Sequence, residues 1–211
     1  MPQPLTLTSL PLFPLAAVLL PGGHLALRVF EVRYLDMVRK CQQAGAPFGV
    51  VCLRSGSEVR KAGAPQEQLH AVGTLARITQ LQSPQPALIH LECEGTQRFH
   101  IQRSHVLPHG LWVADVQLLP ADHPTAVPPH LMVASAALAR VLASLPERPG
   151  HRPTPQPTAE QLGDCGWVAN RWCELLPVPQ ELKQQLMQLD NPLVRLELVA
   201  DVLDRTGIAR A

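Results

Sequence analysis

The sequence has few aromatic residues, few lysines and almost no excess of charge of either sign. Aromatic residues make up 4% of its 211 positions, the lysines are Lys40, Lys61 and Lys183, and the formal net charge is +1. Proteins that bind nucleic acid or anionic membranes usually carry a basic face, which this balance does not provide. We therefore expect neither nucleic acid nor a membrane among the partners of this chain.

The motifs of several enzyme classes are missing as well. The sequence has no G-x-x-x-x-G-K-[ST] loop for nucleotide phosphates, and no H-E-x-x-H or C-x-x-C pair for a metal. The lysines stand where solvated charges are expected, so no serine–lysine catalytic pair is predicted. His100, His105 and His109 are close in sequence, but they straddle strand and turn positions at which histidines usually face solvent. The sequence predicts no enzyme, no cofactor and no metal site.

Long apolar runs are also absent. No stretch of eighteen apolar residues occurs, so the sequence predicts no membrane-spanning helix. Residues 10–20 are apolar, but no Lys or Arg precedes Arg28, and two prolines would break the apolar helix of an export signal. We therefore expect a cytoplasmic protein with reduced thiols. The cysteines fall at apolar periodic positions and are predicted to be buried: Cys41, Cys52, Cys93, Cys165 and Cys173.

The sequence contains a clear succession of local patterns between residues 10 and 45. Prolines in residues 11–21 favour extended chain, and Pro21-Gly22-Gly23 favours a turn. Residues 24–29 alternate between polar or small and apolar side chains, which predicts a half-buried strand. After Phe30 the apolar period becomes helical, and Gly45 stands where a helix C-cap is expected. The order predicted here is strand, turn, strand and helix.

Further short apolar segments separated by turn signals continue to residue 120. They predict strands over residues 48–53, 72–81, 87–94 and 112–118, with a surface loop over 54–68. Turns are predicted at 83–86 and 108–110. Gly95 is expected to end the run that starts at Ala87, with Phe99 and Ile101 continuing the apolar face. This spacing is typical of a small closed or nearly closed antiparallel barrel.

The periodicity becomes helical after a proline-rich boundary at residues 120–129. A first helix carries an apolar stripe over residues 131–145, and residues 146–157, with many prolines, predict a mobile loop. Thr158 and Gln161 have the form of a capping box and predict one helix over the following residues to Leu176. Two more helices follow, the last opened by Asn191 with Pro192 in its first turn. We expect a helical bundle over residues 121–211.

Several of these segments resemble the substrate-recognition domain found at the N-terminus of Lon proteases and in small stand-alone bacterial relatives. They are PLFPL and PGG followed by LRVFEVRYLDMV, then PFGVV, VGTLARI, Glu94-Gly95 with RFHI, and LDNPLVRLELVADVL. The resemblance implies an α+β fold in which residues 1–120 form a PUA-like antiparallel β pseudo-barrel with one helix. The helical bundle of residues 121–211 follows it.

The resemblance also implies a function. It suggests a non-catalytic module of protein quality control that binds unfolded or client polypeptides and works with a protease or chaperone. The alternative is RNA binding, because PUA-type barrels elsewhere bind RNA. The near-neutral charge and the lack of a basic, aromatic-lined strand face disfavour this alternative.

The densest set of mixed charges beside an apolar ridge lies at the predicted strand-to-helix corner. One interpretation is structural, in which the acidic residue favours the helix N-terminus and the arginines form surface pairs. The other is that the corner binds a polypeptide, so that Arg33→Glu would weaken capture without lowering thermal stability. The residues concerned are Arg28, Glu31, Arg33, Tyr34 and Asp36.

Trp167 is a further candidate for polypeptide binding. At 100° per residue it lies almost opposite the apolar stripe that runs from Leu162 to Leu176, so it cannot share the core of that stripe. Either the helix is packed on two sides and Trp167 is buried on the second, or Trp167 is an exposed anchor for a partner.

Overall fold

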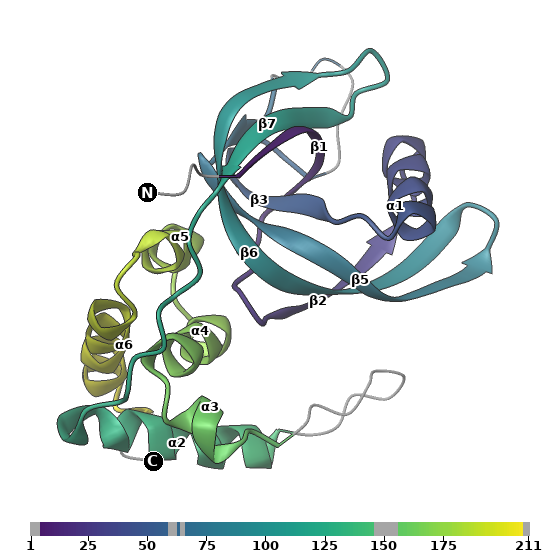
Figure 1. The fold of residues 1–211 in the computed structure, drawn as a ribbon. Helices are drawn as coiled ribbons and strands as arrows, with labels where there is room; N and C mark the ends of the chain where they lie inside the picture. Colours follow the sequence, from purple (N-terminus) through teal and green to yellow (C-terminus); the bar gives the residue numbers. More distant parts are fainter. Residues whose placement is uncertain (1–4, 59–62, 64–65, 146–155, 209–211) are drawn as a thin grey trace. The chain divides into compact units, whose positions relative to one another are not determined.

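The structure is a computed structural model that describes residues 5–58, 63, 66–145 and 156–208. Residue contacts divide the chain into an N-terminal unit, Met1–Ala121, and a C-terminal unit, Asp122–Ala211 (Figure 1). The N-terminal unit contains a seven-stranded sheet and one helix within its described residues, and the C-terminal unit is helical. The α+β fold predicted from the sequence is confirmed.

The N-terminal unit is a barrel built from a single sheet. The strands follow the order β1-β7-β6-β5-β3-β4, β2 pairs with β6, and β1 also pairs with β3, which closes the ring. The elements of this unit are β1 (Thr6–Leu15), β2 (His24–Val29), α1 (Val32–Ala44), β3 (Phe48–Ser55), β4 (Gln68–Leu69), β5 (Val72–Gln85), β6 (Leu88–Val106) and β7 (Trp112–Leu118).

The closing pair β1–β3 is parallel, whereas every other strand pair of the described sheet is antiparallel. Parallel neighbours cannot be joined by a tight hairpin and need a long crossover. The chain supplies one, since β2 and α1 lie between β1 and β3 in sequence. The strand–turn–strand–helix order predicted from the prolines, the Gly22-Gly23 turn and Gly45 is therefore the crossover that closes the barrel.

Two predictions about β6 and its hairpin are wrong. Gly95 does not end a strand, because β6 continues through it from Leu88 to Val106. Gly95 is instead a point of close approach, since a Cβ added there would collide with the carbonyl oxygen of Leu20. The β5–β6 turn lies at Pro86-Ala87, because Ser83 to Gln85 still belong to β5.

The apolar side chains of the barrel form two clusters. The first lies beneath α1 and joins Tyr34, Leu35 and Val38 of that helix to β-strand residues such as Ile89 and Leu91. The second consists of buried strand residues, with Leu12, Val51, Phe99, Trp112, Ala114 and Val116 among its members. Gly73 packs against Phe99, because a Cβ added at Gly73 would lie 2.6 Å from the Phe99 Cζ and 2.6 Å from the Val50 carbonyl oxygen.

The C-terminal unit is built from short helices. Its elements are η1 (Pro129–Leu131), α2 (Met132–Ser144), α3 (Ala159–Leu162), α4 (Cys165–Leu175), α5 (Gln180–Gln188) and α6 (Pro192–Thr206). The capping box of Thr158 and Gln161 is present, and Asn191 accepts hydrogen bonds from Leu193 N and Val194 N at the start of α6. The local end signals read from the sequence therefore appear where they were predicted.

The helix predicted from Thr158 to Leu176 is two helices. Gly163 ends α3, and Asp164 begins α4 by accepting a hydrogen bond from Trp167 N at 2.8 Å. The other oxygen of Asp164 accepts from Thr125 N at 2.9 Å. Because Asp164 caps a helix and binds the segment before η1, the chain breaks there instead of continuing a single helix.

α4 is the central helix of this unit. Eight of its residues are buried, among them Val168, Ala169, Trp172 and Cys173. The indole N–H of Trp172 donates to the Ala134 carbonyl of α2 at 2.9 Å, which satisfies the polar atom of a fully buried tryptophan. At the end of α2, Leu145 is 48% exposed and does not join the buried stripe predicted for that helix.

A charged residue lies at the centre of the C-terminal unit. Arg195 of α6 is 1% exposed, and its guanidinium binds Asp122 through both terminal nitrogens. It also donates to Asn170 Oδ1 at 3.0 Å, to the Leu186 carbonyl at 3.1 Å and to the Leu189 carbonyl. All the N–H donors of the guanidinium are therefore used, as a buried arginine requires.

Residues 146–155 of the proline-rich segment, for which a mobile loop was predicted, lie outside the described residues. Among the described helices, none combines the length and the apolar character needed to cross a membrane.

Candidate functional site

The strand-to-helix corner predicted as a candidate site is formed by the end of β2 and the first turn of α1, residues 28–36. Glu31 occupies the N-cap position, and its carbonyl accepts hydrogen bonds from Tyr34 N and Leu35 N, both at 2.9 Å. Its side chain does not cap the helix but pairs with Arg33 Nη2 at 3.0 Å. The Glu31 carboxylate thus binds the Arg33 guanidinium and does not bind the N–H groups at the start of α1.

Arg33 is a buried structural residue. Only 7% of its side chain is exposed, and Nη1 donates to the Gly110 carbonyl in the β6–β7 turn at 2.8 Å. The guanidinium carbon also lies 4.5 Å from the centre of the Tyr34 ring, within the range of a cation–π contact. Arg33 therefore fastens the start of α1 to a turn that is distant in sequence.

Tyr34 continues this support into the core. Its ring stacks on Phe13 of β1 with centroids 4.1 Å apart, and Phe13 in turn contacts Phe48 of β3. The burial of Arg33 argues against the hypothesis that Arg33→Glu leaves thermal stability unchanged, because the change would bury a carboxylate beside Glu31 and the Gly110 carbonyl. We expect this variant to be less stable than the wild type. Arg33 and Tyr34 thus connect the corner to the β6–β7 turn and to the barrel core.

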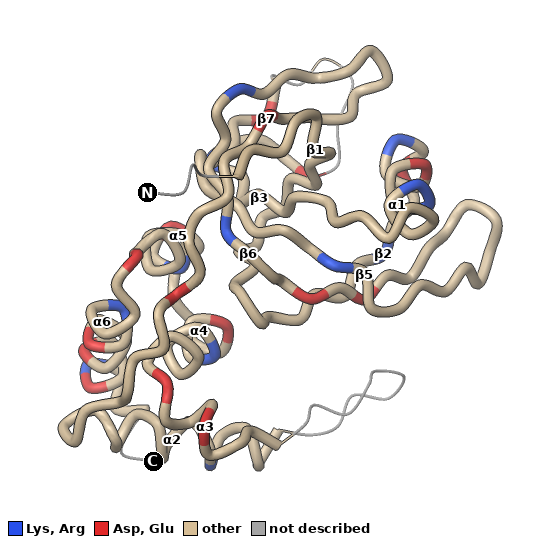
Figure 2. Tube along the Cα trace, viewed as in Figure 1, with Lys and Arg blue, Asp and Glu red and all other residues tan. Residues whose placement is uncertain are grey.

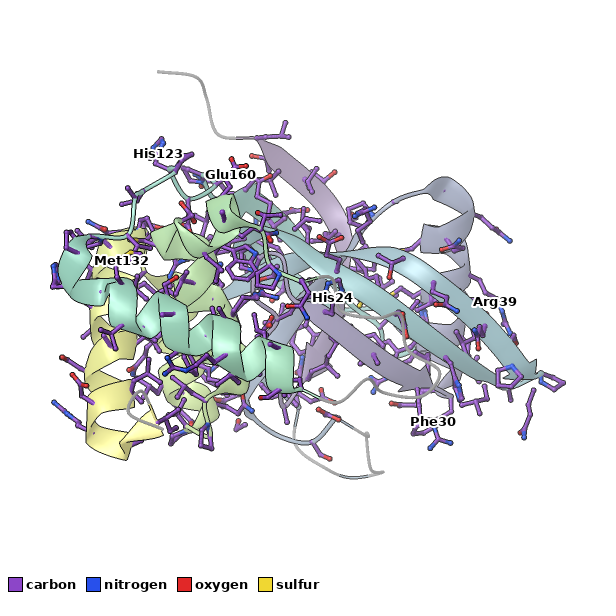
Figure 3. The ribbon with its side chains drawn as sticks, turned by 90° about the horizontal axis from the view of Figure 1, so that it is seen from below. His24, Phe30, Arg39, His123, Met132 and Glu160 are labelled. Atoms are coloured by element: carbon purple, nitrogen blue, oxygen red, sulfur yellow. The ribbon has the colours of Figure 1, made fainter. Side chains whose placement is uncertain are left out.

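The outer side of the corner combines apolar and charged side chains. Phe30 is 55% exposed and Val32 is 73% exposed. The corner therefore presents two neighbouring apolar side chains to solvent. Arg28 and Asp36 are exposed beside them, and Asp36 pairs with Arg39 at 3.8 Å. Figure 2 shows the mixed charges along α1, and Figure 3 labels Phe30 and Arg39.

β2 adds a second feature to this corner. Among the described strands it pairs with β6 alone, in register from His24↔Glu94 to Val29↔Ile89. No described strand pairs with its other edge. A strand edge of this kind offers backbone groups with which an extended peptide can pair.

Phe30 and Val32 were not among the predicted site residues, although the sequence carries a signal for one of them. Phe30 shares the alternation of His24, Ala26 and Arg28, which face away from the core. Its side chain could therefore have been placed on the outer face of β2 from the period alone. Val32 gives no such signal, since it is the first residue of α1 and the strand period ends before it.

Trp167 belongs to the C-terminal unit and is half-buried, between the two alternatives that the sequence left open. α4 is buried around most of its circumference, including Gly166 and Val168 on either side of Trp167 in sequence. A helix packed on more than one side accounts for a tryptophan opposite the main stripe. A role for Trp167 in binding stays a prediction.

Histidines, cysteines and carboxylates elsewhere in the chain are the remaining candidates for a chemical role. Within the part of the chain that the structure describes, no three His, Cys, Asp or Glu side chains gather as metal ligands would. All five cysteines are free and buried, as predicted. Burial raises the pKa of Cys93 and of Cys173 to about 12 and also raises the pKa of Cys41, so these thiols resist ionisation.

The carboxyl group of Glu174 in the C-terminal unit has a raised pKa. Burial raises the pKa of Glu174 to about 7, against the attraction of Arg171 and Lys183. Arg171 Nη1 lies 2.9 Å from Glu174 Oε2, and Lys183 Nζ donates to the Glu174 carbonyl at 3.1 Å. Because Glu174 is paired with an arginine of its own helix, we interpret the shift as structural.

Solved structures of other proteins have folds similar to that of this chain. A Lon N-terminal domain protein from Xanthomonas campestris, known from a crystal structure, is 35% identical with a TM-score of 0.71, over 92% of this chain and 98% of that chain. The N-terminal domain of the Mycobacterium avium complex Lon protease is 16% identical with a TM-score of 0.57, over 92% and 96% of the two chains. The second likeness concerns the fold alone.

Sequence comparisons give the same relationship. The Lon protease of Paraburkholderia phytofirmans is 27% identical over 191 residues, which cover 89% of this chain and 23% of that protease. The chain thus spans less than a quarter of the protease that it matches. The family profile described as the ATP-dependent protease La (LON) substrate-binding domain matches residues 9–205. The chain therefore belongs to the Lon substrate-binding domain family.

Proposed function

We propose that the protein is a non-catalytic module that binds polypeptides, and that the corner formed by β2 and α1 is its binding surface. The family description as a substrate-binding domain supports a binding role, and the relatives named above are Lon proteases or their N-terminal domains. The partners would be unfolded or client polypeptides, captured in the cytoplasm. A separate protease or chaperone would act on the captured chain.

The observation that carries this proposal is the exposure of Phe30 and Val32 on a rigid support. Apolar side chains that are more than half exposed gain free energy when a partner covers them, at about 25 cal/mol per Å² of buried apolar surface. Arg33 and Tyr34 keep the corner in place, so little ordering is needed on binding. The open edge of β2 can add backbone hydrogen bonds that do not depend on the sequence of the client.

The charged residues at the corner have a different role in this proposal. Arg28 and Asp36 are exposed, so they would stay hydrated at the rim of the contact and influence orientation more than affinity. Trp167 would be a contact of the C-terminal unit with the same class of partner. We propose it as a secondary position because its side chain is already partly buried.

The experiment is a binding titration with a fluorescently labelled, permanently unfolded polypeptide, followed by anisotropy. The double variant Phe30→Ser with Val32→Ser should bind at least about tenfold more weakly, because it removes two apolar contacts from the surface. Leu5→Ser is the matched control, since Leu5 is a 64% exposed apolar residue of the same unit, outside the corner. Both proteins should keep the wild-type melting temperature.

Equal affinity of the wild type and of the double variant would exclude the corner as the binding surface. Loss of affinity in Leu5→Ser as well would indicate non-specific adhesion of apolar surface. Absence of binding by the wild type would remove the proposed function itself.

A further inference from the structure

A pocket of about 290 Å³ opens beside β4 in the N-terminal unit. It is lined by residues 67–71, by Ile101 and Ser104 of β6 and by Trp112 of β7. The corner formed by β2 and α1 contributes no residue to it. Its volume is close to the lower end of the range for pockets that hold whole ligands, so it fits a single side chain better than a free cofactor.

The pocket contains a buried carboxylate. Glu67 is 8% exposed, and Trp112 Nε1 donates to its Oε2 at 3.4 Å. No other described residue forms a hydrogen bond or an ion pair with the Glu67 side chain. No lysine or arginine lines the pocket among the described residues.

Among the described residues, Glu67 has no cationic side chain as a partner. Buried charges are usually paired, and a single long hydrogen bond from an indole compensates little of the lost hydration. Glu67 is therefore able to accept charge-assisted hydrogen bonds from a cation that enters the pocket. Trp112 adds the aromatic group to which guanidinium and ammonium ions bind best.

The remaining walls suit the stem of a long side chain. Leu69 and Ile101 are half-buried apolar residues, and they can cover the methylene groups of a lysine or arginine. Ser104 and His70 supply polar groups at the same pocket. This combination of an apolar passage and a carboxylate is complementary to a cationic side chain.

The walls are fixed by the sheet. β4 pairs with β3 through Leu53↔Leu69, and His70 N donates to the Cys52 carbonyl at 3.0 Å. On the other side, Ile101 N donates to the Ala71 carbonyl at 2.8 Å. A ligand would find the pocket formed and would not have to order it.

We propose that this pocket takes the arginine or lysine side chain of a bound polypeptide, with Glu67 as the charge partner and Trp112 as the aromatic wall. The inference rests on the proposed function, because it supplies a preference for basic residues within the clients. It places that preference at a site separate from the apolar corner.

The test uses the full chain and two short capped peptides that differ at one position, glycine–arginine–glycine and glycine–citrulline–glycine. Citrulline keeps the shape of arginine without its charge. The readout is the indole N–H signal of Trp112 in a ¹⁵N–¹H spectrum, assigned by its absence in Trp112→Phe. The arginine peptide should shift this signal saturably, and the citrulline peptide should bind at least about tenfold more weakly.

Glu67→Gln should lose the response to the arginine peptide, whereas Glu92→Gln, a half-buried carboxylate on another part of β6, should keep it. The lysine analogue of the peptide should also shift the signal. An equal response to arginine and citrulline, or none to either, would overturn the proposal, and this comparison needs only the wild-type protein.

The two proposals can fail separately. If the unfolded polypeptide does not bind the wild type but the arginine peptide still shifts Trp112, the pocket is a cation site without the proposed function. If Phe30→Ser with Val32→Ser abolishes polypeptide binding and the Trp112 signal is insensitive to every peptide, the corner alone carries the function.

Discussion

Replacing Arg195 by methionine should destabilise the C-terminal unit strongly, although methionine fills a similar volume. The guanidinium holds together four parts of this unit: Asp122 before η1, Asn170 of α4, the α5 residue Leu186, and Leu189 just after α5. Methionine donates no hydrogen bond, so all of these acceptors lose a donor in a region from which water is largely excluded.

The size of the loss in unfolding free energy depends on the acceptors that remain without the guanidinium. Asp122 keeps 18% of its side chain exposed and can recover part of its hydration, whereas Asn170 and the Leu186 carbonyl are enclosed by protein. Removing one partner of a buried ion pair costs about 3–5 kcal/mol, and we expect a value in this range. A domain is stable by only about 5–15 kcal/mol, so the variant should be close to unfolding.

The assay is urea denaturation followed by tryptophan fluorescence in a Trp112→Phe background. The remaining indoles, Trp167 and Trp172, both belong to α4, so the signal reports the C-terminal unit. Comparing variants within the same background avoids assuming that the two units unfold together. The midpoint and slope give the change in the free energy of unfolding.

Two further variants control the result. Arg205→Met changes an exposed arginine on the same helix and should cost less than about 0.5 kcal/mol. Arg195→Lys keeps the charge but cannot reproduce the planar fork, so it should still lose a large part of the stabilisation. A loss below about 1 kcal/mol for Arg195→Met would refute the view that this network organises the unit.

Three more predictions can be tested on the same protein. Because Glu174 has a pKa of about 7 in the folded chain and an ordinary value of 4.5, the folded state binds more protons between these values, and stability should fall by up to about 3 kcal/mol as the pH rises from 4.5 to 7. Glu174→Gln should remove this dependence in pH-resolved denaturation, and an unchanged slope would contradict the assigned cause. Gly73→Ala should destabilise the N-terminal unit by about 1–3 kcal/mol in thermal unfolding, since its Cβ would lie 2.6 Å from the Val50 carbonyl oxygen, and a neutral effect would show that the barrel can relax there. Trp167→Ala should cost about 1–3 kcal/mol, between an exposed and a buried tryptophan, and a loss below about 0.5 kcal/mol would favour an exposed anchor.

Local signals in the sequence predicted much of this fold. The cap at Gly45, the capping box at Thr158 and Gln161, and Asn191 with Pro192 each depend on neighbours within a few residues, and each is present. Such features can be predicted from the sequence because their interaction partners are only a few residues away in the chain.

The features that the sequence did not reveal have distant partners. Nothing near Arg33 indicates that it binds the carbonyl of Gly110, and nothing near Arg195 points to Asp122. Periodicity assigns charged residues to the surface, so both buried arginines were missed. Gly95 misled for a related reason, because its close neighbour Leu20 belongs to another part of the chain and only the folded barrel brings them together.

The same reasoning explains why some residues predicted at the candidate corner are buried. A dense group of charges drew attention to residues 28–36, and the exposed positions Arg28 and Asp36 agree with a surface role. Arg33 and Tyr34 are instead buried beneath the surface of the corner and support it. The apolar residues Phe30 and Val32, which face solvent, were not among the predicted site residues.

The parallel β1–β3 pair and the antiparallel β1–β7 pair have a consequence for folding in the cell. β1 is synthesised before the other described strands of its unit, yet one of its partners, β7, is the last of them. Until residues 112–118 have been synthesised, one edge of β1 has no strand to pair with, and such edges are prone to aggregation. A protein proposed here to hold unfolded chains thus passes through a stage of its own synthesis in which its first strand needs the same protection.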